Sequence, residues 1–180
     1  MTPAELIDRY SAFTDSAVRL ESRQHYAVPG DEERQRAYRE GRPLPQRPGK
    51  AATLRLISEA VQVGKAFERV HIVDRPLSDY VRYELEAAYP ENVAAGERVW
   101  IVDRSAHPEL AAVDRDFVLF DAGTGHASVV WYDYAAGGGL VGYTRGTQDD
   151  IEICARTLDV ARAHALPLGE FMISSFREAH

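Results

Sequence analysis

The sequence has a single cysteine, fewer basic than acidic residues and no long apolar run, and each of these shortages excludes a class of protein. The single Cys154 rules out an internal disulfide and a cysteine-cluster metal site, and it fits a reducing cytoplasm. The formal charge of -7 opposes binding to nucleic acid or to an anionic membrane. No apolar run is long enough to span a membrane, and Glu5, Asp8 and Arg9 interrupt the region where a signal peptide needs its apolar core. We therefore expect a cytoplasmic protein that binds neither nucleic acid nor membrane.

The length of 180 residues suits one main domain. Residues 41–49 hold three prolines and two glycines, so this segment must be loop or extended chain. Because about fifty residues rarely sustain a core of their own, we expect residues 1–49 to form an N-terminal arm packed on the main domain. Within this arm, residues 16–26 alternate enough to form a strand. The regular patterns begin at Lys50, and residues 50–180 are expected to form the main α/β domain.

Two nearly identical heptapeptides are the most informative feature of the chain. They are residues 69–75 (RVHIVDR) and residues 98–104 (RVWIVDR). Each is a β-branched run that ends in Asp-Arg, and the residues between them have the apolar spacing of a helix. The pattern predicts a strand, a crossover helix that begins at Pro76 and ends at Pro90, and a second parallel strand.

The residues after the second heptapeptide predict hairpins and then helices. Residues 117–121, 127–134 and 140–144 read as strands separated by glycine-rich turns. Thr147 and Asp150 form a capping-box pattern that begins a long helix, which Pro167 ends. The fold class is therefore α+β, with a mixed sheet in which a βαβ unit precedes an antiparallel meander and helices pack on the sheet.

The Asp-Arg ends of the two heptapeptides are the first candidate site. Asp74, Arg75, Asp103 and Arg104 would meet at the carboxyl edge of the parallel strands, where ligands of open sheets tend to bind. The arginines would then clamp a phosphate or a carboxylate. The alternative is that each arginine pairs with one of the aspartates, which leaves no charge for a ligand.

His71 is a further candidate for this site. It lies in the first heptapeptide where the second has Trp100, which favours packing on a shared face over proton transfer. Aromatic residues suggest a separate surface for a protein partner, because tyrosine, tryptophan and arginine dominate binding hot spots. Its candidate residues are Tyr80, Arg82, Tyr83 and Trp131, and ordinary packing is the alternative.

The sequence gives no pattern for catalysis, metal or cofactor. Asp114 and Asp116 fall on one face of an extended segment and Asp121 on the other, so they do not converge on a cation without a bend. The six histidines show no pair at zinc-ligand spacing. The serines lack nucleophile-elbow glycines, and the run at residues 137–139 belongs to a hairpin rather than to a phosphate loop. We expect neither catalytic residues, nor a metal, nor a cofactor.

The element order and one aspartate resemble a single half of the phospholipase D superfamily, whose signature is His-x-Lys followed after four residues by Asp. Asp121 matches that signature, whereas Asp114 and Asp116 replace the histidine and the lysine. The resemblance implies the scaffold without the phosphodiesterase chemistry, because aspartates would repel a phosphate. Single halves of that superfamily build their groove across a two-fold axis, so the resemblance also implies a homodimer.

A second resemblance rests on the amino-acid sequences of several segments. Residues 69–85, residues 95–97, residues 116–121 and residues 19–21 resemble an uncharacterised actinobacterial domain family of nearly this length. Its members are often encoded near helix-turn-helix regulators, which implies a regulatory setting. We therefore expect a non-catalytic regulatory or protein-interaction protein, and its candidate partner is a helix-turn-helix transcription regulator. The alternative is a sensor of a phosphorylated small ligand, or a phosphodiesterase-like enzyme, that uses the Asp-Arg edge.

Overall fold

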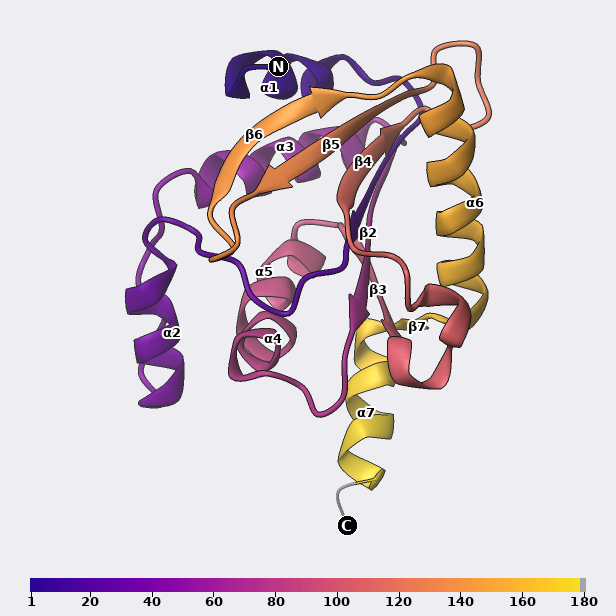
Figure 1. The fold of residues 1–180 in the computed structure, drawn as a ribbon. Helices are drawn as coiled ribbons and strands as arrows, with labels where there is room; N and C mark the ends of the chain where they lie inside the picture. Colours follow the sequence, from indigo (N-terminus) through magenta and orange to yellow (C-terminus); the bar gives the residue numbers. More distant parts are fainter. Residues whose placement is uncertain (179–180) are drawn as a thin grey trace.

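The computed structural model describes residues 1–178, and in that part of the chain the strands form a seven-stranded mixed sheet with the order β6-β5-β4-β1-β2-β3-β7 (Figure 1). The sheet and the helices around it confirm the predicted α+β class. None of the helices in residues 1–178 is both long and apolar enough to cross a membrane. The strands are β1 (Ser16–Glu21), β2 (Ala66–Val73), β3 (Arg98–Asp103), β4 (Asp116–Phe120), β5 (Ser128–Tyr134), β6 (Leu140–Arg145) and β7 (Leu166–Pro167).

The two heptapeptides lie in β2 and β3, which are neighbouring parallel strands as predicted. Between them run α4 (Asp79–Tyr83), a π-helical turn (Glu84–Ala88) and α5 (Tyr89–Ala94). The expected ends of this crossover were wrong. Ser78 caps the N-terminus of α4 with its side chain, and Pro90 lies at the start of α5, directly after the π-helical turn, so the helical path continues through it.

The meander and the long helix agree with the sequence patterns. β4, β5 and β6 pair antiparallel in that order, and Gly138 makes the last hairpin turn with a φ of 81°. The predicted capping box begins α6 (Gln148–His164), with Thr147 and Asp150 in reciprocal hydrogen bonds. The chain then adds β7 to the outer side of β3 and continues into α7 (Leu168–Glu178).

The N-terminal segment differs from the expected arm. Its strand β1 lies in the middle of the sheet, parallel to β2 and antiparallel to β4. The apolar side chains of Val18 and Leu20 are buried in the main core, so residues 1–49 share that core. The segment also contains α1 (Pro3–Ala12) and α2 (Asp31–Arg39), and α3 (Lys50–Gln62) follows it.

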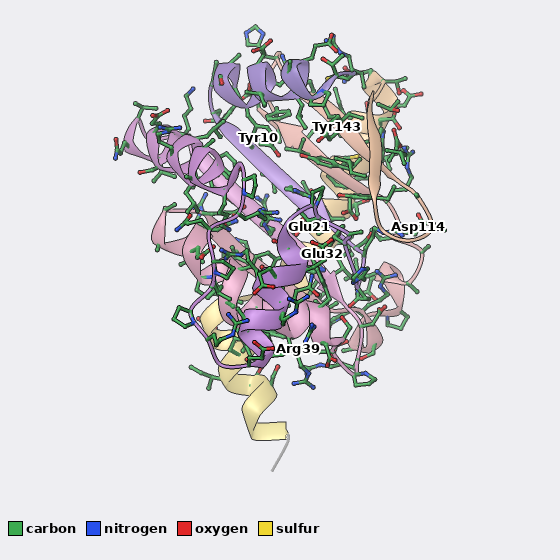
Figure 2. The ribbon with its side chains drawn as sticks, turned by 90° about the vertical axis from the view of Figure 1, so that its left-hand side faces the viewer. Tyr10, Glu21, Glu32, Arg39, Asp114 and Tyr143 are labelled. Atoms are coloured by element: carbon green, nitrogen blue, oxygen red, sulfur yellow. The ribbon has the colours of Figure 1, made fainter. Side chains whose placement is uncertain are left out.

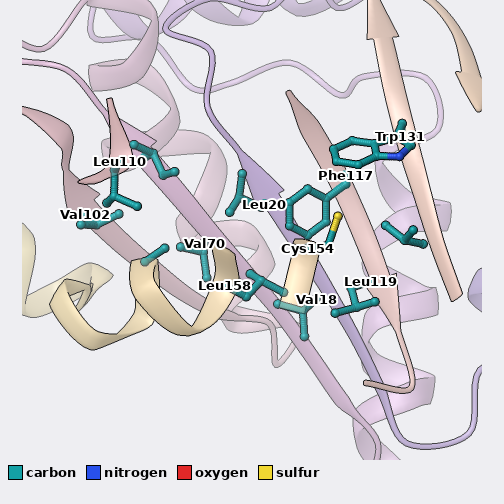
Figure 3. Packing of buried hydrophobic residues seen from close by; sticks show 13 residues of the cluster. Val18, Leu20, Val70, Val102, Leu110, Phe117, Leu119, Trp131, Cys154 and Leu158 are labelled. Atoms are coloured by element: carbon teal, nitrogen blue, oxygen red, sulfur yellow. The ribbon is translucent and has the colours of Figure 1, made fainter. Parts of the chain in front are cut away.

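The helices cover both faces of the sheet. α6 packs on one face, while α3 and the crossover helices lie on the other, as Figure 1 shows. Under α6, Leu20, Val70 and Leu119 from neighbouring strands meet Cys154 and Leu158 in a closely packed cluster (Figure 3). Burying one such aliphatic side chain contributes roughly 1.5–3 kcal/mol. The opposite face is apolar at its two ends, whereas its middle carries charged side chains that form the candidate site.

Candidate functional site

A cavity of about 280 Å³ lies on the sheet face opposite α6, between β1, β2, β5 and β6, the crossover helices and α2. Glu21 of β1 and Tyr143 of β6 are among the residues that line it, and both are labelled in Figure 2. We call this cavity the tyrosine pocket because, among the described residues, seven tyrosines line it. They are Tyr26, Tyr80, Tyr83, Tyr89, Tyr132, Tyr134 and Tyr143.

Strand alternation places the charged side chains of this pocket. In β1, Val18 and Leu20 point toward α6, so Arg19 and Glu21 point to the opposite face. The register of β1 with β2 sets Arg19 beside Arg69. Two guanidinium groups therefore lie side by side on a covered face, where they need a carboxylate between them.

Glu21 is that carboxylate. Its Oε1 lies 2.8 Å from Nη2 of Arg19, and its Oε2 lies 2.6 Å from Nη1 of Arg69. The hydroxyl of Tyr89 also lies 2.7 Å from Oε2. Burial alone would raise the pKa of Glu21, but Arg19 and Arg69 outweigh it and hold that pKa well below its usual range. Glu21 is a fixed anion in the floor of the pocket.

Glu84, in the π-helical turn, behaves in the opposite way. It is buried, and its burial together with the negative charge of Glu21 raises its pKa well above the usual range. Within residues 1–178, its Oε2 has no hydrogen-bond partner, and the nearest basic atom is Nδ1 of His71 at 3.7 Å. Two carboxyl groups in one pocket thus have pKa values displaced in opposite directions.

His71 lies beneath the pocket and is fully buried, with 0% of its surface exposed. Its Nε2 is 3.0 Å from the carbonyl oxygen of Arg23. Because a carbonyl only accepts, Nε2 carries the proton, and Nδ1 is the acceptor that faces the Tyr89 hydroxyl at 2.8 Å. Burial lowers the pKa of His71, which keeps the ring neutral. His71 therefore orients Tyr89 and does not itself reach the pocket.

Arg19 is one of the basic groups that line the pocket. Its guanidinium lies over the ring of Tyr132 at 4.4 Å from the ring centre, and its Nη2 donates to the Tyr134 hydroxyl at 3.1 Å. In the described part of the chain, its buried Nε has no hydrogen-bond acceptor. An N–H buried without an acceptor costs about 1–3 kcal/mol, and a bound oxygen atom would remove that cost.

The segment after β1 forms the outer wall. Arg34 of α2 donates to the Tyr83 hydroxyl at 3.1 Å and to the carbonyl of Pro45 at 2.7 Å, and it pairs with Glu91 of α5 at 2.7 Å. Arg47 lies 3.3 Å from Asp31. These contacts tie the proline-rich loop and α2 to the crossover helices. The residues expected to form an arm therefore close one side of the pocket.

Comparison with known proteins adds one finding. A family model described as a domain of unknown function (DUF6879) matches residues 4–173. The chain belongs to this family. No curated protein and no solved structure matches the sequence. The match confirms that the chain belongs to an uncharacterised domain family, while the actinobacterial setting and the phospholipase D-like scaffold stay predictions.

The Asp-Arg edge of this family member is closed by crossed ion pairs. Nε of Arg75 lies 3.1 Å from Asp103, and Nε of Arg104 lies 3.2 Å from Asp74. The four side chains meet because β2 and β3 are adjacent and parallel, as the heptapeptides predicted. Arg75 also donates to Ser175 of α7 at 2.8 Å, and Arg104 donates to the carbonyl of Ser22 at 2.8 Å. The geometry favours the alternative in which these charges pair with each other.

His71 and Trp100 do not share a face. The register between β2 and β3 is displaced by one residue relative to the alignment of the heptapeptides, so His71 pairs with Ile101 and Trp100 pairs with Val70. Since successive strand residues point to opposite faces, Trp100 packs near α6 while His71 points toward Tyr89. The expectation of a shared face was wrong for this reason.

The predicted aromatic surface is not one surface. Tyr80 and Tyr83 are buried in the wall of the tyrosine pocket, and Arg82 between them is exposed. Trp131 lies on the other face of the sheet, where its ring meets Phe117 at 5.4 Å and the guanidinium of Arg115 at 4.2 Å. These two tyrosines therefore form part of the pocket wall and do not contribute to an outer surface.

Two of the three aspartates considered for a cation are engaged by separate protein partners. Asp116 is buried and accepts hydrogen bonds from Ser22 and from the Tyr26 hydroxyl. Asp121 accepts from consecutive backbone N–H groups that include those of Thr14 and Asp15, at 2.9 and 2.7 Å. The one residue that matches the phospholipase D signature is thus an anchor for the start of β1.

Sequence reasoning missed the residues at the centre of the pocket. Arg19, Glu21 and Arg69 alternate with buried apolar residues, a pattern that normally indicates a solvent-facing side of a strand. The central place of β1 depends on pairing with β4, about a hundred residues later in the chain, and no local signal reveals such pairing. It also missed a cluster of His107, Glu109 and His164, because His164 is distant in sequence from the other two.

Proposed function

We propose that the protein is a non-catalytic regulatory protein that binds a small anionic ligand in the tyrosine pocket. The observation that carries the proposal is Arg19, which lines a cavity rich in aromatic rings with a partly exposed side chain and whose Nε, within the described residues, lacks an acceptor. Small-ligand sites combine apolar walls with a few well-placed polar groups, and this cavity has that composition.

The lining indicates the kind of ligand. A carboxylate or phosphate oxygen would satisfy Arg19, and a planar ring would stack on the tyrosines. The volume of about 280 Å³ lies near the lower limit of typical small-molecule pockets, which favours a compact compound. The phosphorylated small ligand expected at the Asp-Arg edge also suits this pocket, because aromatic rings surround the basic side chains here.

The pocket also suggests how ligand binding would reach a partner. Its outer wall is α2, which Arg34 ties to the crossover helices, and the opposite side of α2 exposes Glu32 and Arg39 (Figure 2). A ligand that favours one position of α2 would change the surface that this helix offers. We propose a protein partner, with a helix-turn-helix regulator as the candidate that the family resemblance suggests.

A ligand screen by thermal shift tests the pocket. The full chain would be heated with aromatic carboxylates, nucleoside monophosphates and sugar phosphates, and a specific ligand should raise Tm. Arg19→Met should abolish the rise. Arg115→Met is the matched control, because Arg115 covers an aromatic ring on the other face of the sheet. A uniformly flat screen, or an equal response in Arg19→Met, would count against the proposal.

Loss of binding in Arg19→Met must be separated from loss of fold, since Arg19 pairs with buried Glu21. Tyr134→Phe provides that separation, because it removes the hydroxyl that meets Arg19 and keeps the ring. We expect it to fold normally and to bind the ligand more weakly. Unchanged affinity in this variant would argue that the ligand binds elsewhere.

Two further measurements test the assembly. Co-purification from the native host should recover a stable protein partner, and repeated recovery of the chain alone would undercut that part of the proposal. Light scattering after gel filtration tests the homodimer, for which the support is the phospholipase D-like resemblance. A mass near the 20.1 kDa of one chain would exclude it.

One observation favours a second function, that of an acid-base enzyme. Enzymes often hold two carboxyl groups with pKa values displaced in opposite directions, and Glu21 and Glu84 have this relationship. Glu84 would serve as the acid. A ligand found in the screen allows Glu84→Gln to separate the two functions. If the protein is an enzyme, the wild-type chain should convert the compound, and the variant should bind it without converting it. If the protein is a sensor, neither the wild type nor the variant should convert it.

A further inference from the structure

His107, Glu109 and His164 bring their side chains together on the α6 side of the molecule, away from the tyrosine pocket. His107 lies between the two 3₁₀ turns that follow β3, Glu109 lies in the second of these turns, and His164 is the last residue of α6. The two imidazole rings stack with their centres 4.0 Å apart and their planes 22° apart. One carboxylate oxygen of Glu109 lies 3.0 Å from Nε2 of His164 and 3.6 Å from Nδ1 of His107.

From this geometry we propose that His107, Glu109 and His164 form a binding site for a divalent transition-metal ion of the zinc class. One potential ligand atom from each residue lies within 4.8 Å of the others. Bonds of about 2.0–2.1 Å in a tetrahedral site put neighbouring ligand atoms roughly 3.3 Å apart. The two measured N···O distances fall on either side of that value. The distances suit an ion, and the stacked rings must rotate out of their nearly parallel arrangement before both imidazoles can aim a nitrogen at it.

The donor types select the class of metal. Two imidazole nitrogens and one carboxylate oxygen suit zinc and its neighbours in the transition series, whereas calcium and magnesium prefer oxygen alone. The side chains are 25%, 44% and 38% exposed for His107, Glu109 and His164. This exposure gives an ion access from solvent and leaves room for water as a fourth ligand.

The position of the site favours a cation for a second reason. The carbonyl groups at the C-terminus of a helix carry a partial negative charge, and His164 ends the long helix α6. Arg162, in the same last turn, pairs with Glu68 on the sheet. An ion bound at this point would join the end of α6 to the connection between β3 and β4. Metal binding would thus stabilise two elements that are distant in sequence.

The test uses the full chain without a histidine tag, first stripped of metal by a chelator. Zinc titration by calorimetry should give one site per chain that is absent when magnesium is titrated. Zinc at a hundredfold excess over its dissociation constant should raise Tm by on the order of 5 °C or more. His107→Ala and His164→Ala should each abolish the rise, and Glu109→Gln should weaken it. His126→Ala is the matched control, since His126 is an exposed histidine in a separate loop.

Cobalt absorption gives a readout that does not depend on stability. Cobalt bound to the three side chains should produce visible d–d bands in the wild-type chain that are lost in His164→Ala. The proposal would be overturned if the wild-type chain did not bind zinc saturably. It would also be overturned if one-to-one binding persisted when both histidines are replaced. Neither result would bear on the tyrosine pocket, because Arg19 and its neighbours lie on the other face of the sheet.

Discussion

The hydroxyl of Tyr89 lies 2.8 Å from Nδ1 of His71, the nitrogen that must act as acceptor in the neutral ring. The same hydroxyl lies 2.7 Å from Glu21, so one proton serves two acceptors beneath the pocket. A buried network of this kind is sensitive to the loss of any member. It connects the fixed anion of the pocket floor to the backbone at Arg23 through His71.

Tyr89→Phe should therefore destabilise the protein by about 1–3 kcal/mol, because it leaves buried acceptors on Glu21 and His71 with fewer donors. Urea unfolding measures this change. Tyr38→Phe is the matched control, since the Tyr38 hydroxyl meets Glu86 at the surface, and it should cost less than about 1 kcal/mol. Equal losses in the two variants would contradict the network.

Glu84→Gln should stabilise the protein increasingly as the pH rises. Burial raises the pKa of Glu84, so the folded state keeps a proton that the unfolded chain releases above its usual value of roughly 4.3. Stability from this group is therefore complete at low pH and declines toward neutral pH. Glutamine cannot ionise, so the variant does not lose stability at this position as the pH rises.

Urea unfolding of both forms at about pH 5 and about pH 8 measures this difference. The free energy of unfolding of Glu84→Gln, relative to that of the wild type, should be higher at the alkaline pH than at the acidic pH. Glu86→Gln, at an exposed position in the same π-helical turn, controls for the substitution itself. If the advantage of Glu84→Gln in free energy of unfolding became smaller toward alkaline pH, the pKa of Glu84 would not be raised by folding.

Asp121 should contribute stability that is lost in acid. Burial would raise its pKa, but the backbone N–H groups of Asp15, Ser16 and Thr14 outweigh this and lower it. A lowered pKa means that the contribution is present above the unfolded value, roughly 3.9, and disappears as the pH falls through the folded value. Asp121→Ala should cost about 2–3 kcal/mol at neutral pH.

Asp121→Asn keeps an oxygen acceptor and tolerates the positive φ of 51° at this position, so it should cost about 1 kcal/mol. Urea midpoints for the three forms between neutral pH and about pH 3 follow the loss. The gap between wild type and Asp121→Asn should narrow as the pH drops. If the difference in urea midpoint between wild type and Asp121→Asn did not change with pH, the negative charge of Asp121 would make no contribution to its hydrogen bonds with the start of β1.

The crossed ion pair between Arg104 and Asp74 should contribute little energy. The Asp74 side chain is half exposed, and such pairs are worth about 0.2–1 kcal/mol. A double-mutant cycle with Arg104→Ala and Asp74→Ala, followed by urea unfolding, measures the coupling alone. A coupling above about 2 kcal/mol would show that this edge matters more for stability than its exposure indicates.

Much of the fold could be predicted because its signals are local. The β-branched heptapeptides, the glycine turns of the meander and the capping box at Thr147 each act over a few residues, and the structure contains the elements that they predict. Pro90 was misread because a proline at the start of a helical segment resembles one that ends a helix. The preceding π-helical turn, which allows the helical path to continue, has no sequence signature of its own.

The candidate site could not be predicted in the same way, because it depends on contacts between distant segments. Arg19 and Glu21 alternate like surface residues, and only the covering segments from α2 to α5 make them interior. His107 and His164 lie on different elements, so their stacking follows from the way α6 packs on the sheet. The Asp-Arg edge was the exception, since parallel pairing alone brings its ends together.

The central place of β1 also affects synthesis of the chain. Ala17 must pair with Phe120, which is translated about a hundred residues later than β1. Until then one edge of β1 is unpaired, and exposed edges of this kind recruit strands from other molecules. Contacts between such distant residues also slow folding. The nascent protein should therefore depend on chaperones until the meander has emerged, and fragments that end before β4 should aggregate.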